Sequence, residues 1–337
     1  FHTDWGLLQR FLMQKLLVIC GPTGTGKTDL ALSLAEKFNG ELVSADSRQV
    51  YIGMDIGTGK ELVEVKRQKA KGKKLIQKFK NYWLVGNIPT HLYDVKNPDE
   101  RFSLAEYQQL ALARIKEIQS RKKLPILVGG TGLYIQAVTE GLNIPKAPPD
   151  FKLRERLENE RIEVLLSDLE KFDPKTYQKI DKNNKRRIVR ALEVYYQLGE
   201  PFSKLQEKYK VNFDILKIGL SAERNTLYQK VDKRIEQWFE NGFIAEVKTL
   251  IRKYSPNLAS MSSVGYRQAV MFIQGKLDLS SAKLRMKFDT HGYIRRQLTW
   301  FKRDPSINWY DITMGNSSEE VSFLVKSFLE KENNDNS

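Results

Sequence analysis

The feature that most constrains the fold of this 337-residue chain is the octapeptide GPTGTGKT, residues 21–28. It follows the apolar run KLLVIC, which is typical of a buried parallel strand, and it leads into a helical apolar pattern that ends at Asn39-Gly40. Glycines at this spacing allow backbone N–H groups to surround phosphate oxygens, and the start of a helix adds positive potential. The octapeptide therefore predicts a phosphate-binding loop for a diphosphate or a triphosphate.

The polar side chains of this loop have expected roles. Lys27 neutralises charge on the terminal phosphates, and the hydroxyl of Thr28 is a ligand for Mg²⁺, the cofactor that we expect. The loop does not specify which molecule carries the phosphates. The residues expected to bind the diphosphate or nucleotide are Gly21, Pro22, Thr23, Gly24, Thr25, Gly26, Lys27 and Thr28.

Strand and helix patterns alternate along the rest of the chain. Residues 41–46, 124–134 and 213–223 read as further strands, and residues 102–120 read as an amphipathic helix with a capping box at Ser103 and Glu106. This alternation predicts an α/β fold with a P-loop NTPase-like parallel sheet flanked by helices.

Composition shifts suggest where this sheet is interrupted. The proline-rich stretch PKAPPD ends at Asp150, and a charged region with helical patterning and little strand signal follows it. We expect residues 1–12 to precede the native domain, and the Lys-rich segment 61–83 to be a surface excursion. The expected organisation is a catalytic core in two parts (13–148 and 209–310), an inserted helical domain (149–208) and a C-terminal tail (311–337).

Composition also narrows the class of protein. The formal net charge of +15 favours a polyanionic partner such as nucleic acid or a membrane surface. The single cysteine, Cys20, excludes a disulfide framework and fits a reducing cytoplasm, and three histidines with one cysteine do not make a usual zinc cluster. No apolar run is long enough for a membrane span, so we expect no membrane partner. We also expect a cytoplasmic protein that is a monomer.

Two predicted strand ends carry polar side chains that have alternative explanations. Asp46 follows the second strand, where it serves either as a general base close to the phosphate-binding loop or as the cap of a turn. Thr131, in VGGTGLY, either lines a site or belongs to an ordinary tight turn. Asp94 is a poor match to the strand-end carboxylate of an ATPase, which weakens a motor function.

Two basic stretches are equally ambiguous. On a helix, Arg186, Arg187 and Arg190 gather on one side, either as phosphate contacts or as a solvated face. The stretch IRRQLTWFKRD, residues 294–304, is either an RNA-stacking surface or a core helix with a basic rim. The GYRQ stretch around Tyr266 and Arg267 has the same two interpretations.

Seven motifs together resemble one family. GPTGTGKT, ADSRQVYIGMDIGTGK, LPILVGGTGLYIQAV, RRIVRALEVY, GFIAEVKTL, VGYRQAV and RRQLTWFKRD are similar, in the same order, to motifs of the bacterial-type tRNA dimethylallyltransferases, or tRNA isopentenyltransferases. The resemblance implies transfer of a dimethylallyl group from dimethylallyl diphosphate to the exocyclic amine of adenosine 37, 3′ of the anticodon, in tRNAs that read codons beginning with U. It implies that the phosphate-binding loop holds the diphosphate leaving group, and that the partner is a tRNA anticodon stem-loop.

The resemblance also assigns roles to residues. It implies that Asp46 is the general base, that Thr23 contacts the reacting end of the diphosphate, and that Arg224 is a second diphosphate-binding arginine. The stacked adenosine would have to be flipped out to reach Asp46. The residues implied to contact tRNA are Asp46, Ser47, Arg48, Gln49, Thr131, Arg154, Arg186, Arg187, Ile188, Val189 and Arg190.

Three other functions remain open at the level of sequence. An adenylate isopentenyltransferase would share the phosphate loop and the base, but it would need neither the helical domain nor the basic face. A P-loop small-molecule kinase would need a triphosphate donor and a mobile arginine lid. A non-catalytic RNA-binding protein would not need a phosphate loop beside a strand-end carboxylate.

Overall fold

The computed structural model describes residues 15–60, 76–80, 82–206, 208–315 and 317–331. Residues 1–12, and residues 61–75 and 81 of the Lys-rich segment, lie outside the described residues. The chain divides into two compact units, one built from the parts before Gln136 and after Val211 and the other from residues 136–211. Among the described residues, no helix has the length and apolarity that crossing a bilayer requires.

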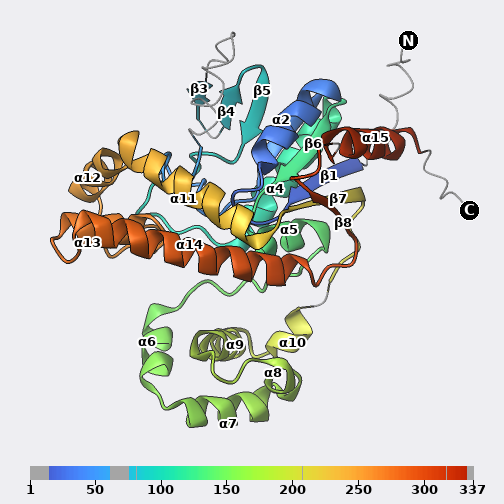
Figure 1. Ribbon diagram of the computed structural model, residues 1–337. Helices are drawn as coiled ribbons and strands as arrows, with labels where there is room; N and C mark the ends of the chain where they lie inside the picture. Colours follow the sequence, from blue (N-terminus) through green and yellow to red (C-terminus); the bar gives the residue numbers. More distant parts are fainter. Residues whose placement is uncertain (1–14, 61–75, 81, 207, 316, 332–337) are drawn as a thin grey trace, which may run out of the picture. The chain divides into compact units, whose positions relative to one another are not determined.

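The first unit is built on one eight-stranded sheet (Figure 1). The central strand β1 pairs in parallel with β6 and β7, so that Leu17 lies opposite Ile126 on one side and Leu216 on the other. Among the described strands of this sheet, β4 pairs antiparallel with β3 and with β5. In spatial order the strands are β3 (Ile76–Phe79), β4 (Tyr82–Val85), β5 (Ile88–His91), β2 (Gly40–Ser44), β6 (Leu124–Val128), β1 (Lys15–Cys20), β7 (Asp214–Ser221) and β8 (Ile307–Asp311).

The burial of β1, β2 and β6 explains their unbroken apolar runs, since every residue of these three strands is buried. Helices α2 (Lys27–Lys37) and α4 (Leu104–Ser120) pack on this part of the sheet, and the capping box of Ser103 with Glu106 is present. The expected α/β fold with a mostly parallel sheet flanked by helices is therefore confirmed.

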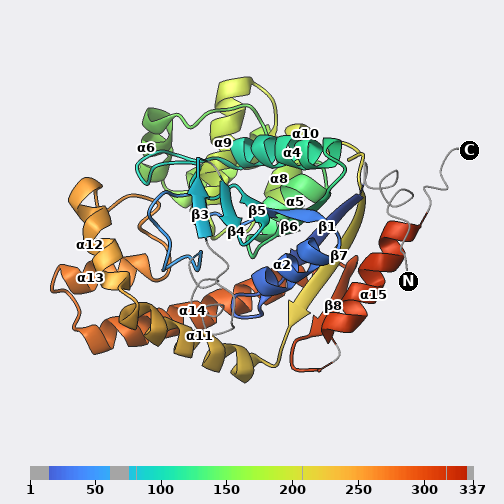
Figure 2. The same ribbon diagram turned by 90° about the horizontal axis from the view of Figure 1, so that it is seen from above.

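A group of four helices completes the first unit. They are α11 (Arg224–Glu240), α12 (Phe243–Lys253), α13 (Tyr266–Ile273) and α14 (Leu279–Phe301). Helices α11 and α14 run side by side along most of their length (Figures 1 and 2). This pair follows β7 and precedes β8, and it carries side chains toward the phosphate-binding loop.

The second unit is helical. Its core is formed by Leu157, Leu165, Leu169, Ile188 and Leu192. It starts earlier than the expected inserted domain 149–208 because Gly141 accepts a backbone hydrogen bond from Tyr209, which joins the two ends of the unit. Its helices are α6 (Phe151–Asn159), α7 (Ile162–Phe172), α8 (Pro174–Lys179), α9 (Lys185–Leu198) and α10 (Phe202–Leu205), preceded by the second half of α5 (Gly132–Thr139).

Two segments differ from the sequence expectation. Residues 311–337 were expected to form a tail, but they include α15 (Ser317–Glu330), whose Val321, Val325 and Leu329 are buried in the sheet core. The described end of the segment 61–83 contains β3 and β4, with Trp83 fully buried. Apolar side chains recur at helical spacing in α15 and at alternating spacing in β4. Both segments therefore have an apolar face that packs into the first unit.

Candidate active site

A cavity of about 640 Å³ lies at the carboxyl ends of the parallel strands, where open α/β sheets place their ligands. It extends from the phosphate-binding loop to Asp46. Its lining includes the cationic side chains of Lys27, Lys230, Lys233 and Arg234, together with the carboxylates of Asp29 and Asp46. The other lining residues are Thr23, Gly24, Thr25, Gly26, Thr28, Gln49, Thr58, Gly59, Tyr93, Val128, Gly129, Gly130, Gln237, Tyr293, Gln297 and Ile312.

The phosphate-binding loop has the conformation that its glycines permit. Gly21, Gly24 and Gly26 have φ values of 132°, 90° and 78°, which side chains disfavour. A Cβ on Gly21 would also lie 2.3 Å from the carbonyl oxygen of Leu220 on β7. The loop is closed internally, because the Thr25 hydroxyl donates to the Pro22 carbonyl over 2.9 Å.

Lys27 lies folded over this loop. Its Nζ donates to the Pro22 carbonyl over 2.6 Å. Burial, and next the nearby Arg234, lower the pKa of Lys27 to about 8. An anion in the cavity would oppose both effects, so the loop is arranged to gain charge stabilisation from a bound phosphate group.

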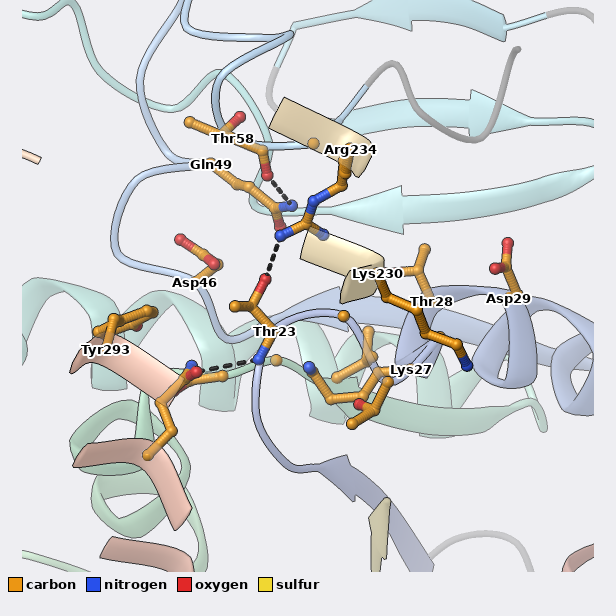
Figure 3. Close-up of a pocket in the computed structure, with 18 of the residues that line it drawn as sticks. Thr23, Lys27, Thr28, Asp29, Asp46, Gln49, Thr58, Lys230, Arg234 and Tyr293 are labelled. Atoms are coloured by element: carbon orange, nitrogen blue, oxygen red, sulfur yellow. Dashed lines mark hydrogen bonds between the residues drawn. The ribbon is translucent and has the colours of Figure 1, made fainter. Parts of the chain in front are cut away.

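Arg234 and Gln297 hold Thr23 from two different helices. Figure 3 shows Arg234 bound to Thr23. The Nη2 atom of Arg234, on α11, donates to Thr23 Oγ1 over 2.5 Å. Gln297, on α14, accepts from the Thr23 N–H over 2.9 Å and donates to the Gly130 carbonyl over 2.9 Å. The Nε of Arg234 is buried without a hydrogen-bond partner in the described structure, so it is available to an anion.

The arginine of α11 that lines the cavity is Arg234, and not the expected Arg224. Arg224 is exposed at the first position of the helix and does not line the cavity, whereas Arg234 does. Ten residues of helix separate the two side chains by about 15 Å. Lys230, Arg234 and Gln237 are spaced at i, i+4 and i+7, so the helical periodicity of this segment indicates that these three lining residues share one face.

Asp46 caps a turn and also lines the cavity. Its Oδ1 accepts from the backbone N–H of Arg48 over 2.8 Å, which is the turn cap, and its half-buried side chain also lines the cavity. Burial, and next the Asp46 charge, raise the pKa of both Tyr93 and Tyr293, the two tyrosines of the lining. The charge of Asp46 therefore acts on both tyrosines of the cavity lining.

The residues that follow Asp46 are fixed by neighbouring loops. The backbone N–H of Ser47 donates to Thr131 Oγ1 over 3.1 Å, which joins the two strand-end motifs. Arg48 Nη1 donates to the Ala259 carbonyl over 2.9 Å. Gln49 donates from Nε2 to the Thr58 carbonyl over 3.1 Å, so the orientation of its amide is set (Figure 3).

The residues expected to contact tRNA in the second unit separate into two groups. Arg154 and Arg190 both bind the carboxylate of Glu193, over 2.7 Å and 2.6 Å, and the Glu193 side chain has no exposed surface. Ile188 and Val189 are buried, at 0% and 2% exposed, so their side chains are not available to RNA.

Arg186 and Arg187 are exposed, which fits both a phosphate contact and a solvated face. Both are exposed at the start of α9, whose first turn follows Asn184. Arg190 lies on the same helix, but its side chain binds Glu193. Of the three arginines expected on one exposed side of the helix, Arg186 and Arg187 are exposed.

The other basic stretches belong to the core of the first unit. Tyr266 is fully buried, and Arg267 forms an ion pair with Asp289 over 2.7 Å. In residues 294–304, Ile294 and Phe301 are buried while Arg295 and Arg296 are exposed, which is a core helix with a basic rim.

Comparison with known proteins identifies the family. A family model described as IPP transferase matches residues 49–304, and one described as isopentenyl transferase matches residues 14–70. The chain belongs to the IPP transferase family. The family expected from the sequence motifs, the tRNA dimethylallyltransferases, is thereby confirmed.

Relatives of this IPP transferase match it over most of its length. It is 41% identical over 304 residues to a protein of Geotalea uraniireducens named tRNA dimethylallyltransferase 2, with 88% of this chain and 92% of the relative covered. Among solved structures, it resembles the tRNA isopentenylpyrophosphate transferase of Bacillus halodurans (TM-score 0.67, 34% identity, 94% and 97% covered). It also resembles a eukaryotic dimethylallyltransferase acting on tRNA (TM-score 0.76, 26% identity, 94% and 79% covered).

Proposed function

We propose that this IPP transferase transfers the dimethylallyl group of dimethylallyl diphosphate to the exocyclic amine of adenosine 37 in tRNAs that read codons beginning with U. The observation that carries the proposal is the single cavity that joins the phosphate-binding loop to Asp46. A prenyl donor needs a diphosphate site, and an amine acceptor needs a proton acceptor a short distance away.

The loop end of the cavity suits the leaving group. When the allylic C–O bond breaks, its electron pair goes to the departing diphosphate, so negative charge grows on the diphosphate oxygens. Lys27 and Arg234, with the backbone N–H groups of the loop, supply fixed positive charge and donors at that place. Gln297 supports this function by holding the Thr23 backbone.

We propose that Mg²⁺ assists at the same end. Thr28 and Asp29 both line the cavity, and hydroxyl and carboxylate oxygens belong to the donor class that Mg²⁺ prefers. The ion would be held by Thr28 and by oxygens of the substrate, and it would supply further stabilisation of the diphosphate charge.

The other end of the cavity suits the acceptor. As the new N–C bond forms, the adenine amine gives up a proton, and we propose that Asp46, whose carboxylate lines this end of the cavity, accepts it. The Arg48 N–H fixes the Asp46 side chain. We assign contacts with the nucleotide to Ser47, Arg48, Gln49 and Thr131, which the structure gathers around Asp46.

The size of the acceptor accounts for the basic surface. An adenosine stacked in an anticodon loop has to be flipped out to enter a cavity. Arg186 and Arg187 are exposed cations suited to phosphate contacts on such an RNA. Free AMP would need neither these residues nor the second unit.

A competition assay tests the proposal. Labelled dimethylallyl diphosphate and Mg²⁺ are supplied with unmodified tRNA and free AMP together. Label on tRNA alone is the expected result. Label on AMP would identify an adenylate isopentenyltransferase, and ATP turnover without prenyl transfer would identify a kinase.

A further inference from the structure

The carboxylate of Glu246, on α12, binds a loop that lies next to the cavity. Its Oε2 accepts from the backbone N–H groups of Asp55 over 3.1 Å and Ile56 over 2.7 Å. Its Oε1 accepts from the Gly57 N–H over 3.5 Å and from the Tyr266 hydroxyl over 2.6 Å. Consecutive amides that point at one anion form a concave anion-binding nest, and here the anion is a side chain of the same protein.

The packing around Gly57 brings this loop close to α12 and α13. A Cβ on Gly57 would lie 2.4 Å from the Phe243 ring and 2.6 Å from the Tyr266 ring. Phe243 and Tyr266 are themselves fully buried and stack edge to face. The loop can therefore adopt only a narrow range of positions while the bonds to Glu246 are present.

The same loop forms part of the cavity wall, although Glu246 does not. Thr58 and Gly59 line the cavity directly after the three amides that Glu246 binds. The Thr58 carbonyl accepts from Gln49 Nε2 over 3.1 Å, and the Ser44 hydroxyl donates to Gln49 Oε1 over 2.8 Å. A continuous series of contacts thus connects Glu246 to the Gln49 amide beside Asp46.

We infer that Glu246 is a positioning residue for the acceptor end of the cavity: it fixes the loop of residues 55–59, and the loop fixes Gln49. The inference rests on the proposed function, because it takes the Asp46 end as the place of the acceptor base. Glu246 contacts no part of the cavity, so it acts through the loop and not on the substrate. The diphosphate end has separate supports in Arg234 and Gln297.

Kinetics of four variants test this inference. Glu246→Ala leaves three amides without their acceptor, and displacement of the loop should lower kcat/KM for tRNA about 100-fold. The dissociation constant for dimethylallyl diphosphate without acceptor should stay unchanged. Glu246→Gln keeps one acceptor oxygen and should lie between wild type and Glu246→Ala, and Tyr266→Phe should have a smaller effect. The matched control is Glu236→Gln, which removes a half-buried carboxylate bound to Lys283 and Lys287 on the same group of helices.

A double-mutant cycle with Gln49→Ala decides whether the effect passes through Gln49. If it does, adding Glu246→Ala to Gln49→Ala should lower kcat/KM for tRNA little further. Additive losses, or a Glu246→Ala enzyme as active as the Glu236→Gln control, would overturn the inference. If Glu246→Ala does not fold, the cycle is run with Glu246→Gln.

Amide hydrogen exchange gives a readout that does not need catalysis. Residues 55–59 should exchange faster in Glu246→Gln than in wild type, while the phosphate-binding loop keeps its exchange rate. Equal exchange at residues 55–59 would overturn the inference whatever the acceptor is. Absence of prenyl transfer by the wild-type enzyme would instead overturn the proposed function.

Discussion

Arg234 donates a hydrogen bond to the hydroxyl of Thr23, 211 residues earlier in the chain, and so closes the phosphate-binding loop against α11. The bond holds the Arg234 guanidinium near Lys27. Burial is the largest cause of the lowered pKa of Lys27, and the Arg234 charge is the second largest. The two cations repel each other in the same cavity. A bound diphosphate would relieve this repulsion, which links the strength of donor binding to both residues.

Replacement of Arg234 should weaken donor binding. Arg234→Ala removes a cation and the contact to Thr23, so the dissociation constant for dimethylallyl diphosphate should rise by about 10- to 100-fold. Titration calorimetry without acceptor measures the change. Arg224→Ala is the matched control on the same helix and should bind like wild type. Equal loss in the two variants would contradict the placement of the second arginine.

Donor affinity should fall with rising pH because of Lys27. In the free enzyme its pKa is lowered to about 8, and the diphosphate should raise this pKa because it favours the charged amine. Binding then takes up a proton above the free-enzyme pKa, so affinity decreases from about pH 7.5 to pH 10. Calorimetry in buffers of different ionisation enthalpy detects the proton uptake. The Lys27→Met enzyme should bind dimethylallyl diphosphate weakly, and the pH dependence that comes from Lys27 should be absent.

Asp46→Asn separates the two roles of Asp46. The amide oxygen can still accept from the Arg48 N–H, so the turn should persist, but the side chain no longer accepts a proton. Turnover with tRNA should fall by about 100- to 10,000-fold at saturating substrates, with donor affinity preserved. Single-turnover kinetics measure the chemical step. A chemical rate close to wild type would show that another group, or solvent, takes the proton.

Glu193 should be structural, and its loss should destabilise the second unit. Glu193→Gln removes a carboxylate that binds Arg154 and Arg190 and accepts from the Asp150 N–H over 2.8 Å. Breaking one partner of a buried ion pair costs about 3 kcal/mol in the free energy of unfolding. Chemical denaturation measures the loss. Arg186→Ala is the control for removing a charge on the same helix, and its unfolding curve should match wild type.

Arg186 and Arg187 should contribute to RNA affinity through phosphate contacts. Their joint replacement by Ala should reduce the slope of log K against log salt for tRNA by about 1.5 if both neutralise a phosphate. Donor affinity should not change. A slope equal to that of wild type would return both arginines to a solvated surface.

The sequence predicted those parts of the molecule that depend on local patterns. The phosphate-binding loop needs glycines at fixed positions, and the unbroken apolar runs of β1, β2 and β6 reflect burial on both faces. The helix α15 was missed although Val321, Val325 and Leu329 have helical spacing, because a polar end of a chain resembles a frayed tail.

The missed parts of the site depend on tertiary contacts. Gln297 reaches the loop only because α14 packs beside α11, and a glutamine in a helical pattern gives no sign of this. Arg190 and Arg186 look alike in sequence, yet one binds buried Glu193 and the other faces solvent. A charge pattern gives the number of cations on a helix but does not give their partners.

The place of β1 at the middle of the sheet has a consequence for synthesis. One neighbour, β6 (Leu124–Val128), is made before the helical unit of residues 136–211. The other neighbour, β7, which pairs Ile215 with Leu16, is made only after that unit. The nascent chain therefore carries an open parallel edge on β1 while the second unit folds. The anion-binding pocket itself matures last, since Arg234 and then Gln297 are still to be translated when the glycine loop is already outside the ribosome. A nascent chain that ends before Gln297 therefore lacks one of the two side chains that hold Thr23 in the completed protein.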